Sequence, residues 1–199
     1  MLYFMRHGEN KSNLEQTFSG GGSDEPLTET GVKQAEQAAV WLATRQIRRI
    51  YSSPLKRALQ SAHISAERLG LEVSTSEGLR EIRFGVLEGL RYDEALEPFR
   101  VTFSDWLRGN LDSSFDGGET GHEAVQRFSD FLDSLPINDD DVLIVGHGGI
   151  FALGLSALCP DVTRENTGGV VLSNTAMILM NRTQQGLSLV EWGVVEHLE

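Results

Sequence analysis

The chain has 199 residues and a formal net charge of −12, with 17 Lys and Arg side chains against 29 Asp and Glu side chains. This excess of negative charge argues against a general binder of nucleic acids or anionic membranes, because both need a broad positive field. The length favours one domain, and no apolar run approaches the roughly 18 residues of a membrane-spanning helix.

The first half of the chain predicts strands and helices in alternation. Its first segment is short, apolar and aromatic, which is typical of a buried strand, and a polar, glycine-rich loop follows. Thr28 is placed to cap the first helix, and Ser53-Pro54 to open the second, which Gly70 ends. The predicted order is strand, loop, helix, strand, helix and strand, over residues 2–6, 8–27, 29–45, 47–51, 53–69 and 71–75.

The second half continues this pattern. Pro98 lies inside a helical segment and predicts a kink or a break there. Thr120 and Glu123 have the spacing of a capping box. Helical spacing predicts that Phe99, Phe103 and Trp106 belong to the core, and we expect the same of Phe84. The predicted order is two helices, a strand, a helix and two closing strands, over residues 92–108, 120–135, 141–146, 149–158, 169–181 and 187–195.

The alternation of strands and helices predicts an α/β sandwich. Residues 142–145 have no polar face, as expected for a mostly parallel sheet that helices cover on both sides. Ligands of such sheets bind beyond the carboxyl ends of the strands. The residues that directly follow the strands are therefore the first place to look for a functional site.

Cationic and imidazole side chains stand at three of these strand ends. Arg6 and His7 end the first strand, Arg57 follows the second, and His147 follows the strand at 141–146. A neutral imidazole can attack phosphorus, and guanidinium groups can hold the charged oxygens of a phosphoryl group. A carboxylic acid would then supply the proton for the leaving oxygen.

Six sequence blocks, in this order, resemble the histidine phosphatase superfamily, the phosphoglycerate mutase-like group. The resemblance implies a three-layer α/β/α sandwich with a mixed, mostly parallel sheet. It implies a single domain over 1–199 with a helical insertion at about 90–118 over the active site. The resemblance runs from residue 3 to about 176. Its blocks are RHGEN at 6–10 with Asn13, DEPLTETG at 24–31, SSPLKRA at 52–58, LREIRFGVLEG at 79–89, GGET at 117–120 and VGHGG at 145–149.

The resemblance also implies a role for each residue that matches the family's pattern. His7 matches the nucleophile that becomes phosphorylated, and Glu81 matches the donor of a proton to the leaving group. The residues that match the phosphate clamp are Arg6, Arg57 and His147. The residues that match the segment reaching over phosphate and substrate are Asn13, Ser19 and Gly20. No metal and no organic cofactor is implied.

Departures from the mutase pattern favour a phosphatase. Ile82 stands where similar mutases carry an arginine, and residues 92–116 contain only Arg100 and Arg108 as cations. We therefore expect a metal-independent phosphomonoesterase that hydrolyses a small phosphorylated metabolite through a phosphohistidine. The alternatives are phosphoglycerate mutase-type phosphoryl transfer and a non-catalytic phosphate-binding domain.

The remaining expectations concern location and partners. The N-terminal residues do not resemble a signal peptide, and the single cysteine, Cys159, allows no intrachain disulfide, so a cytoplasmic location is expected. We expect a small-molecule substrate, with neither nucleic acid nor membrane as a partner. The sequence leaves open the substrate, a homodimeric state, and the roles of Arg80, Arg83 and His122.

Overall fold

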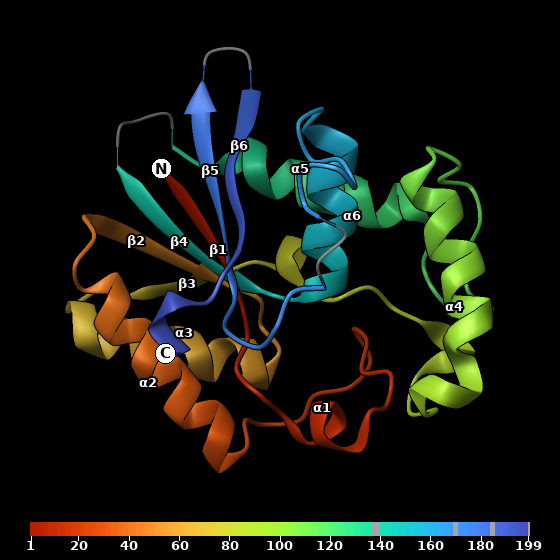
Figure 1. Cartoon of the computed structure of the whole chain (residues 1–199), viewed down its shortest axis with the longest axis horizontal. Coiled ribbons are helices and arrows are strands. Elements are labelled where there is room, and N and C mark those ends of the chain that lie inside the picture. Colours follow the sequence, from red (N-terminus) through yellow and green to blue (C-terminus); the bar gives the residue numbers. More distant parts are fainter. Residues whose placement is uncertain (137–139, 169–170, 184–185, 199) are drawn as a thin grey trace.

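A six-stranded mixed sheet forms the centre of the computed structural model, which describes residues 1–136, 140–168, 171–183 and 186–198 (Figure 1). The strand order is β3-β2-β4-β1-β5-β6, and β5 is the one described strand that runs against the other five. The strands are β1 Leu2–Arg6, β2 Ile47–Ser52, β3 Val73–Thr75, β4 Asp141–Gly146, β5 Met177–Thr183 and β6 Gly186–Val194.

The register of the central strands brings three strand ends to one edge. Parallel pairing places Arg6 of β1 opposite Gly146 of β4, and Ser52 of β2 opposite Val145 of β4. The next residue of each strand therefore leaves the sheet at nearly the same level. This confirms the expected mixed, mostly parallel sheet and sets the position of the site.

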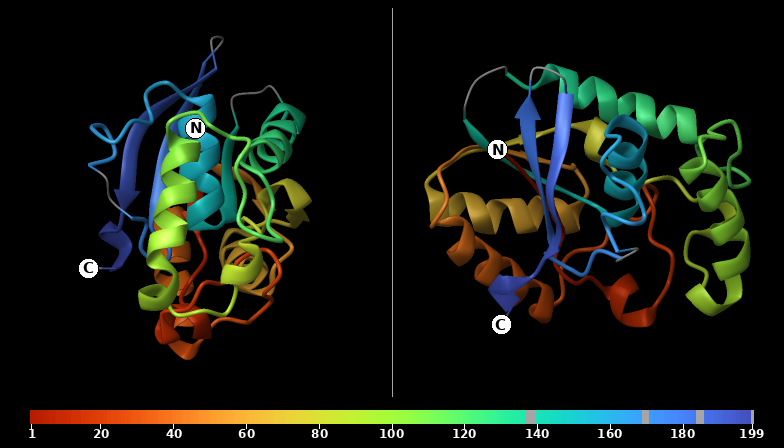
Figure 2. Two further views of the ribbon diagram at one scale, coloured as in Figure 1. Left: turned by 90° about the vertical axis from the view of Figure 1, so that its right-hand side faces the viewer. Right: turned by 45° about the horizontal axis from the view of Figure 1, so that its top comes forward.

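Helices cover both faces of the sheet. Side chains alternate along β1, so that Phe4 packs against α5 and α6, while Met5 joins the cluster formed with α2 and α3 (Figures 1 and 2). The arrangement is the expected α/β/α sandwich. The helices are α1 Lys11–Glu15, α2 Glu29–Leu42, α3 Lys56–Leu69, α4 Tyr92–Leu107, α5 Gly121–Ser134 and α6 Gly148–Leu158. Short 3₁₀ turns lie at Glu77–Leu79, Gly85–Leu87 and Glu196–Leu198.

α4 lies beyond α5 and α6, at the side of the molecule away from α2 and α3 (Figure 1). Its N-terminal end is joined to the segment after α1, because the amide of Tyr92 donates to the carbonyl of Gln16 at 2.8 Å and the amide of Phe18 donates to the carbonyl of Leu90 at 2.9 Å. The predicted core aromatics pack here: Phe84, Phe99, Phe103 and Trp106 all belong to one hydrophobic cluster.

Several element boundaries differ from the sequence expectations. The predicted loop 8–27 contains α1, which a capping box between Asn10 and Asn13 begins. The predicted strand 169–181 was wrong over 171–176, since β5 begins only at Met177; residues 169–170 lie outside the described part. Of the two outcomes expected at Pro98, a kink or a break, the break does not occur, because α4 continues through that residue.

The start of α3 also needs correction. The helix begins at Lys56 after Leu55, and no side chain caps it, so Ser53 does not serve as the predicted cap. The Ser53 hydroxyl is instead hydrogen bonded to His147. Within the described residues, none of the helices combines the length and the apolar character that crossing a membrane would require.

Candidate active site

His7 leaves the end of β1 with both ring nitrogens hydrogen bonded. Its Nδ1 lies 2.6 Å from the carbonyl oxygen of Gly8, which can only accept, so Nδ1 carries the proton. Its Nε2 lies 3.2 Å from Nε of Arg57, which can only donate, so Nε2 presents its lone pair. The two bonds therefore select the tautomer in which Nε2 is the nucleophilic nitrogen.

The surroundings of His7 keep its ring uncharged. Burial, followed by the positive charges of Arg57 and Arg6, holds the pKa of His7 well below its ordinary value. The ring is 4% exposed. An imidazole that is neutral near pH 7 needs no separate base before it attacks.

His147 follows β4 and caps the start of α6. Its ring centroid lies 5.1 Å from that of His7. Its Nε2 lies 2.8 Å from the hydroxyl of Ser53, which also accepts from the amide of Leu55. Burial, and then the nearby Arg57, holds the pKa of His147 well below its ordinary value. His147 thus offers Nδ1 of an uncharged ring, which donates to a ligand oxygen in the tautomer where Ser53 donates to Nε2.

Two guanidinium groups flank these rings. Arg57 is 1% exposed, and beyond His7 it donates to three carbonyl oxygens of the preceding loop, those of Ser19, Gly20 and Ser23. Arg6 donates through Nη1 to the carbonyl of Leu172. Burial lowers the pKa of both guanidinium groups, and the carboxylate of Glu81 acts against that effect.

Three buried polar atoms of the expected site residues have no hydrogen-bond partner among the described residues. They are Nε of Arg6, Nδ1 of His147 and the hydroxyl oxygen of Ser19. Buried polar groups in proteins are nearly always paired, so such a cluster marks a place where a polar ligand binds. A phosphoryl oxygen accepts hydrogen bonds and can serve all three groups.

Glu81 lies at the same edge, and backbone amides hold its carboxylate. Oε1 accepts from the amides of Ile82 at 2.9 Å and Ile150 at 2.8 Å, and Oε2 accepts from the amide of Gly149 at 2.9 Å. The last two amides belong to the first turn of α6. Oε2 accepts only one of these three hydrogen bonds, so its second lone pair is the place for the proton that a substrate oxygen would receive.

The other expected contact residues surround the nucleophile. Oδ1 of Asn13 accepts from Nδ2 of Asn174 at 2.8 Å, and the same amide nitrogen donates to the carbonyl of His7. Ser19 and Gly20 lie in the loop that Arg57 holds. The structure therefore brings all eight predicted site residues to one edge of the sheet.

The residues whose roles the sequence left open lie apart from the phosphate-facing atoms. Arg80 is ion-paired with Glu77 and donates to the carbonyl of Gly21 at 3.2 Å. Arg83 is exposed. His122 is exposed and lies 3.3 Å from a carboxylate oxygen of Asp112.

Sequence reasoning missed the segment that crosses the site before β5. Thr175 donates its amide to the carbonyl of His7 at 3.2 Å, and Asn174 donates to the same oxygen. Thr175 has a φ of 57°, a left-handed conformation that is rare for a β-branched residue. Its hydroxyl lies 3.0 Å from Nε2 of His197. No sequence motif marks Asn174 or Thr175 as part of the site, because their hydrogen-bond partners are distant in the sequence.

The described residues contain no cluster of three or more His, Cys, Asp or Glu side chains placed to hold a metal ion. The charge available to a ligand comes from Arg6 and Arg57. Together with the Nε2 lone pair of His7 and the Nδ1 donor of His147, they form a site suited to transfer of a phosphoryl group.

Comparison with known proteins agrees with this chemistry. Residues 2–195 match the family described as histidine phosphatase superfamily (branch 1). A Hydrogenobacter thermophilus protein, provisionally named phosphoserine phosphatase 2, is 28% identical over 95% of this chain and 93% of its own length. A Yersinia pestis protein, provisionally named a phosphoglycerate mutase, is 34% identical over 79% of this chain and 74% of its own length.

A solved structure extends the likeness to the whole fold. Phosphoserine phosphatase from Entamoeba histolytica, in complex with 3-phosphoglyceric acid, has a TM-score of 0.81 and 27% identity. The alignment covers 100% of this chain and 98% of that one. With the family match over nearly its full length, this chain belongs to branch 1 of the histidine phosphatase superfamily.

Proposed function

We propose that this protein is a phosphomonoesterase that hydrolyses a small phosphorylated metabolite through a phosphohistidine at His7. The observation that carries the proposal is the pair of hydrogen bonds on His7, from Nδ1 to Gly8 and from Arg57 to Nε2. They leave an uncharged nitrogen lone pair facing a buried guanidinium group. A dianionic phosphate ester would enter that space, replacing Arg57 as the partner of Nε2.

In the first step, the Nε2 lone pair of His7 forms a bond to phosphorus and the ester P–O bond breaks. The electron pair of that bond goes to the leaving oxygen, which takes a proton from Glu81. Arg6, Arg57 and the Nδ1–H of His147 neutralise the charge on the phosphoryl oxygens as it develops. The free alcohol then leaves the site.

In the second step, a water molecule attacks phosphorus and the N–P bond breaks. The electron pair of that bond returns to Nε2 of His7. Glu81, now a carboxylate, takes a proton from the water as the new P–O bond forms, and inorganic phosphate leaves. The cycle restores both His7 and the protonated Glu81.

The nature of the relatives supports a small substrate. One relative is named for phosphoserine, and the Entamoeba histolytica phosphatase was solved with 3-phosphoglyceric acid. Both compounds are short alkyl phosphates with a carboxylate. Their oxygen leaving groups are poor, so a proton donor such as Glu81 would matter for them.

Phosphoglycerate mutase activity is the second candidate, because one relative carries that name. A mutase must retain a phosphorylated intermediate and return its phosphoryl group to a different oxygen, which requires additional cations. Ile82, which follows Glu81, is 0% exposed and packs in the hydrophobic core. The position after the acid therefore adds no charge to the site, and hydrolysis is the better supported outcome.

The nucleophile is tested with His7→Ala. Phosphate release from p-nitrophenyl phosphate should fall more than about a thousandfold, because the bond-forming nitrogen is lost. His63→Ala, which removes an exposed imidazole from α3, is the matched control and should retain activity. Activity should survive EDTA. Loss of activity on chelation, with recovery on adding metal, would contradict the mechanism.

The acid is tested with Glu81→Gln and two substrates. The variant should lose about a hundredfold or more in kcat/KM on glycerol 2-phosphate, whose alkoxide needs a proton. This parameter reports the first step and not the water step that all substrates share. The variant should lose far less on p-nitrophenyl phosphate, because its phenolate leaves without a proton. Equal losses on the two substrates would remove Glu81 from the acid role.

A further inference from the structure

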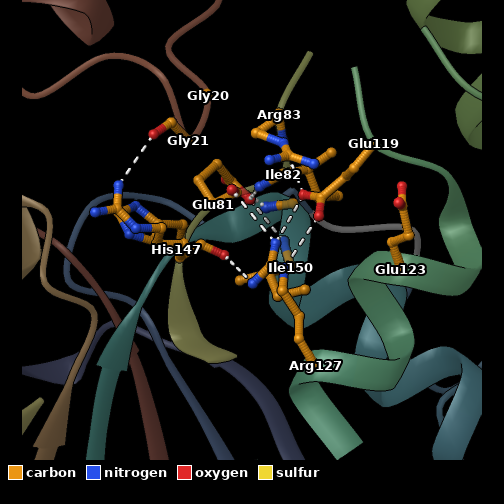
Figure 3. A network of polar contacts seen from close by, with 12 residues as sticks. Gly20, Gly21, Glu81, Ile82, Arg83, Glu119, Glu123, Arg127, His147 and Ile150 are labelled. Atoms are coloured by element: carbon orange, nitrogen blue, oxygen red, sulfur yellow. Dashed lines mark hydrogen bonds and ion pairs between the residues drawn. The ribbon is translucent and has the colours of Figure 1, made fainter. Parts of the chain in front are cut away.

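A partly buried ion pair contacts the Glu81 segment, and the proposed chemistry does not use it. Arg127 of α5 donates through Nε to Oε2 of Glu119 at 3.1 Å and through Nη2 to Oε1 at 2.8 Å. Glu119 is 3% exposed. Figure 3 shows Arg127 reaching from α5 toward Glu119 and the Glu81 segment. The two parallel contacts fix the orientation of the guanidinium plane.

The pair is bound to the backbone on both sides of Glu81. Glu119 accepts the amide of Arg83 at 2.9 Å and donates its own amide to the carbonyl of Arg83 at 3.1 Å. Arg127 donates to three carbonyl oxygens, those of Gly78 at 3.0 Å, Arg80 at 2.7 Å and Glu81 at 3.4 Å. The two side chains thus fix the path of the backbone from before Glu81 to after it.

This stretch lacks the regular backbone hydrogen bonds of a helix or a strand. Residues 80–84 lie between two short 3₁₀ turns and belong to no strand or helix. Backbone carbonyls in such a segment need partners from elsewhere in the fold. Arg127 donates hydrogen bonds to carbonyl oxygens that water would otherwise bind in many different arrangements. It therefore restricts the position of the Glu81 backbone, from which the side chain extends.

Both charges are engaged within the protein. Arg127 and Glu119 bind each other and the backbone. Glu119 loses most of its hydration on burial, and the attraction to Arg127 offsets much of that loss, so the pair is weak evidence of a net gain in stability. The pair is better explained by accurate placement of the Glu81 carboxyl group, which must reach the leaving oxygen. Small displacements of such a group slow catalysis strongly.

We propose that Arg127, together with Glu119, is a positioning residue for the proton donor Glu81. This inference rests on the proposed function, because it takes Glu81 to be the acid. Arg127 acts through the backbone of Gly78–Glu81 and does not touch the substrate. Its loss should therefore impair both proton transfers of Glu81. Only the first of them, the protonation of the leaving group, depends on the substrate.

The test compares Arg127→Met with Arg182→Met on two substrates. Arg182 is the matched control, since it also donates to three carbonyl oxygens, at the end of α5 and away from Glu81. We expect Arg127→Met to lower kcat/KM, which reports the first step, about 30- to 100-fold on glycerol 2-phosphate and less than about threefold on p-nitrophenyl phosphate. Arg182→Met should affect the two substrates equally.

Two further variants make the result decisive. Glu119→Gln keeps an acceptor for the amide of Arg83 but weakens the hold on Arg127, so it should give the same substrate preference at about tenfold. The Glu119→Gln variant replaces Arg127→Met in the test if Arg127→Met does not fold. Equal losses on both substrates for Arg127→Met and Glu119→Gln, while Glu81→Gln discriminates, would overturn this inference alone. No discrimination by Glu81→Gln would overturn it together with the acid step.

Discussion

At the scale of single residues, the hydroxyl of Ser53 is the hydrogen-bond partner of Nε2 of His147. A phosphoryl oxygen can only accept, so Nδ1 must carry the proton when phosphate binds, and Ser53 selects that tautomer by donating to Nε2. Ser53→Ala removes this selection, and the other tautomer would turn a lone pair toward the phosphate. We expect a loss of about tenfold in kcat/KM, equivalent to about 1.4 kcal/mol.

The check for Ser53 is a steady-state assay beside Ser65→Ala. Ser65 is a buried serine of α3 whose hydroxyl donates to the carbonyl of Ser61, within the same helix. Its removal should leave kcat/KM nearly unchanged. Similar losses in the two variants would mean that a buried hydroxyl on this side of the sheet matters only for stability.

At the scale of elements, the start of α6 requires glycine because Glu81 lies against it. A Cβ built on Gly149 would lie 2.7 Å from Oε1 of Glu81, whereas one on Gly148 would meet nothing closer than 3.7 Å. Gly149→Ala should therefore push the carboxylate off the amides of α6, and Gly148→Ala should disturb it much less.

The outcome of Gly149→Ala separates activity from stability. Alanine favours the helix over glycine by about 0.5–1 kcal/mol, which offsets part of the lost hydrogen bonding. We expect an unfolding midpoint close to that of the parent and a loss of activity on alkyl phosphates of about tenfold or more. A large fall in thermal stability with full activity would contradict this assignment for Glu81.

The elements also show what sequence could and could not predict. His7, Arg57 and His147 could be placed together because parallel strands end at one edge, and strand periodicity reveals where each strand ends. The interpretation of Ser53 as a helix cap was wrong, because its hydroxyl is used by a histidine far along the chain. The Arg127–Glu119 pair was also missed, because Arg127 binds carbonyl oxygens that are distant in the sequence and lie in an irregular segment.

At the scale of the whole molecule, two buried neutral histidines make stability depend on pH. The pKa values of His7 and His147 lie well below the ordinary 6.5 in the folded state because of burial. The unfolded chain therefore binds more protons below pH 6.5, and the free energy of unfolding must fall as the pH decreases from there. Above that value these two groups contribute no pH dependence.

The change of the free energy of unfolding with pH can be measured by denaturant unfolding between pH 7 and pH 5. Each of the two histidines should contribute up to about 1.4 kcal/mol per pH unit below its unfolded pKa. His7→Asn removes one titrating group, so its stability should decline less steeply than that of the parent. Parallel pH profiles for the two proteins would show that His7 is protonated in the folded state.

The crossing segment at 172–175 bears on how the molecule reaches its active form. Arg6 and His7 precede their backbone and side-chain partners, Leu172 and Thr175, by more than 160 residues. Contacts of such sequence separation form late, because a long loop must close first. A ribosome-bound chain that has not yet exposed this segment should therefore be inert toward phosphate esters, however complete its helices.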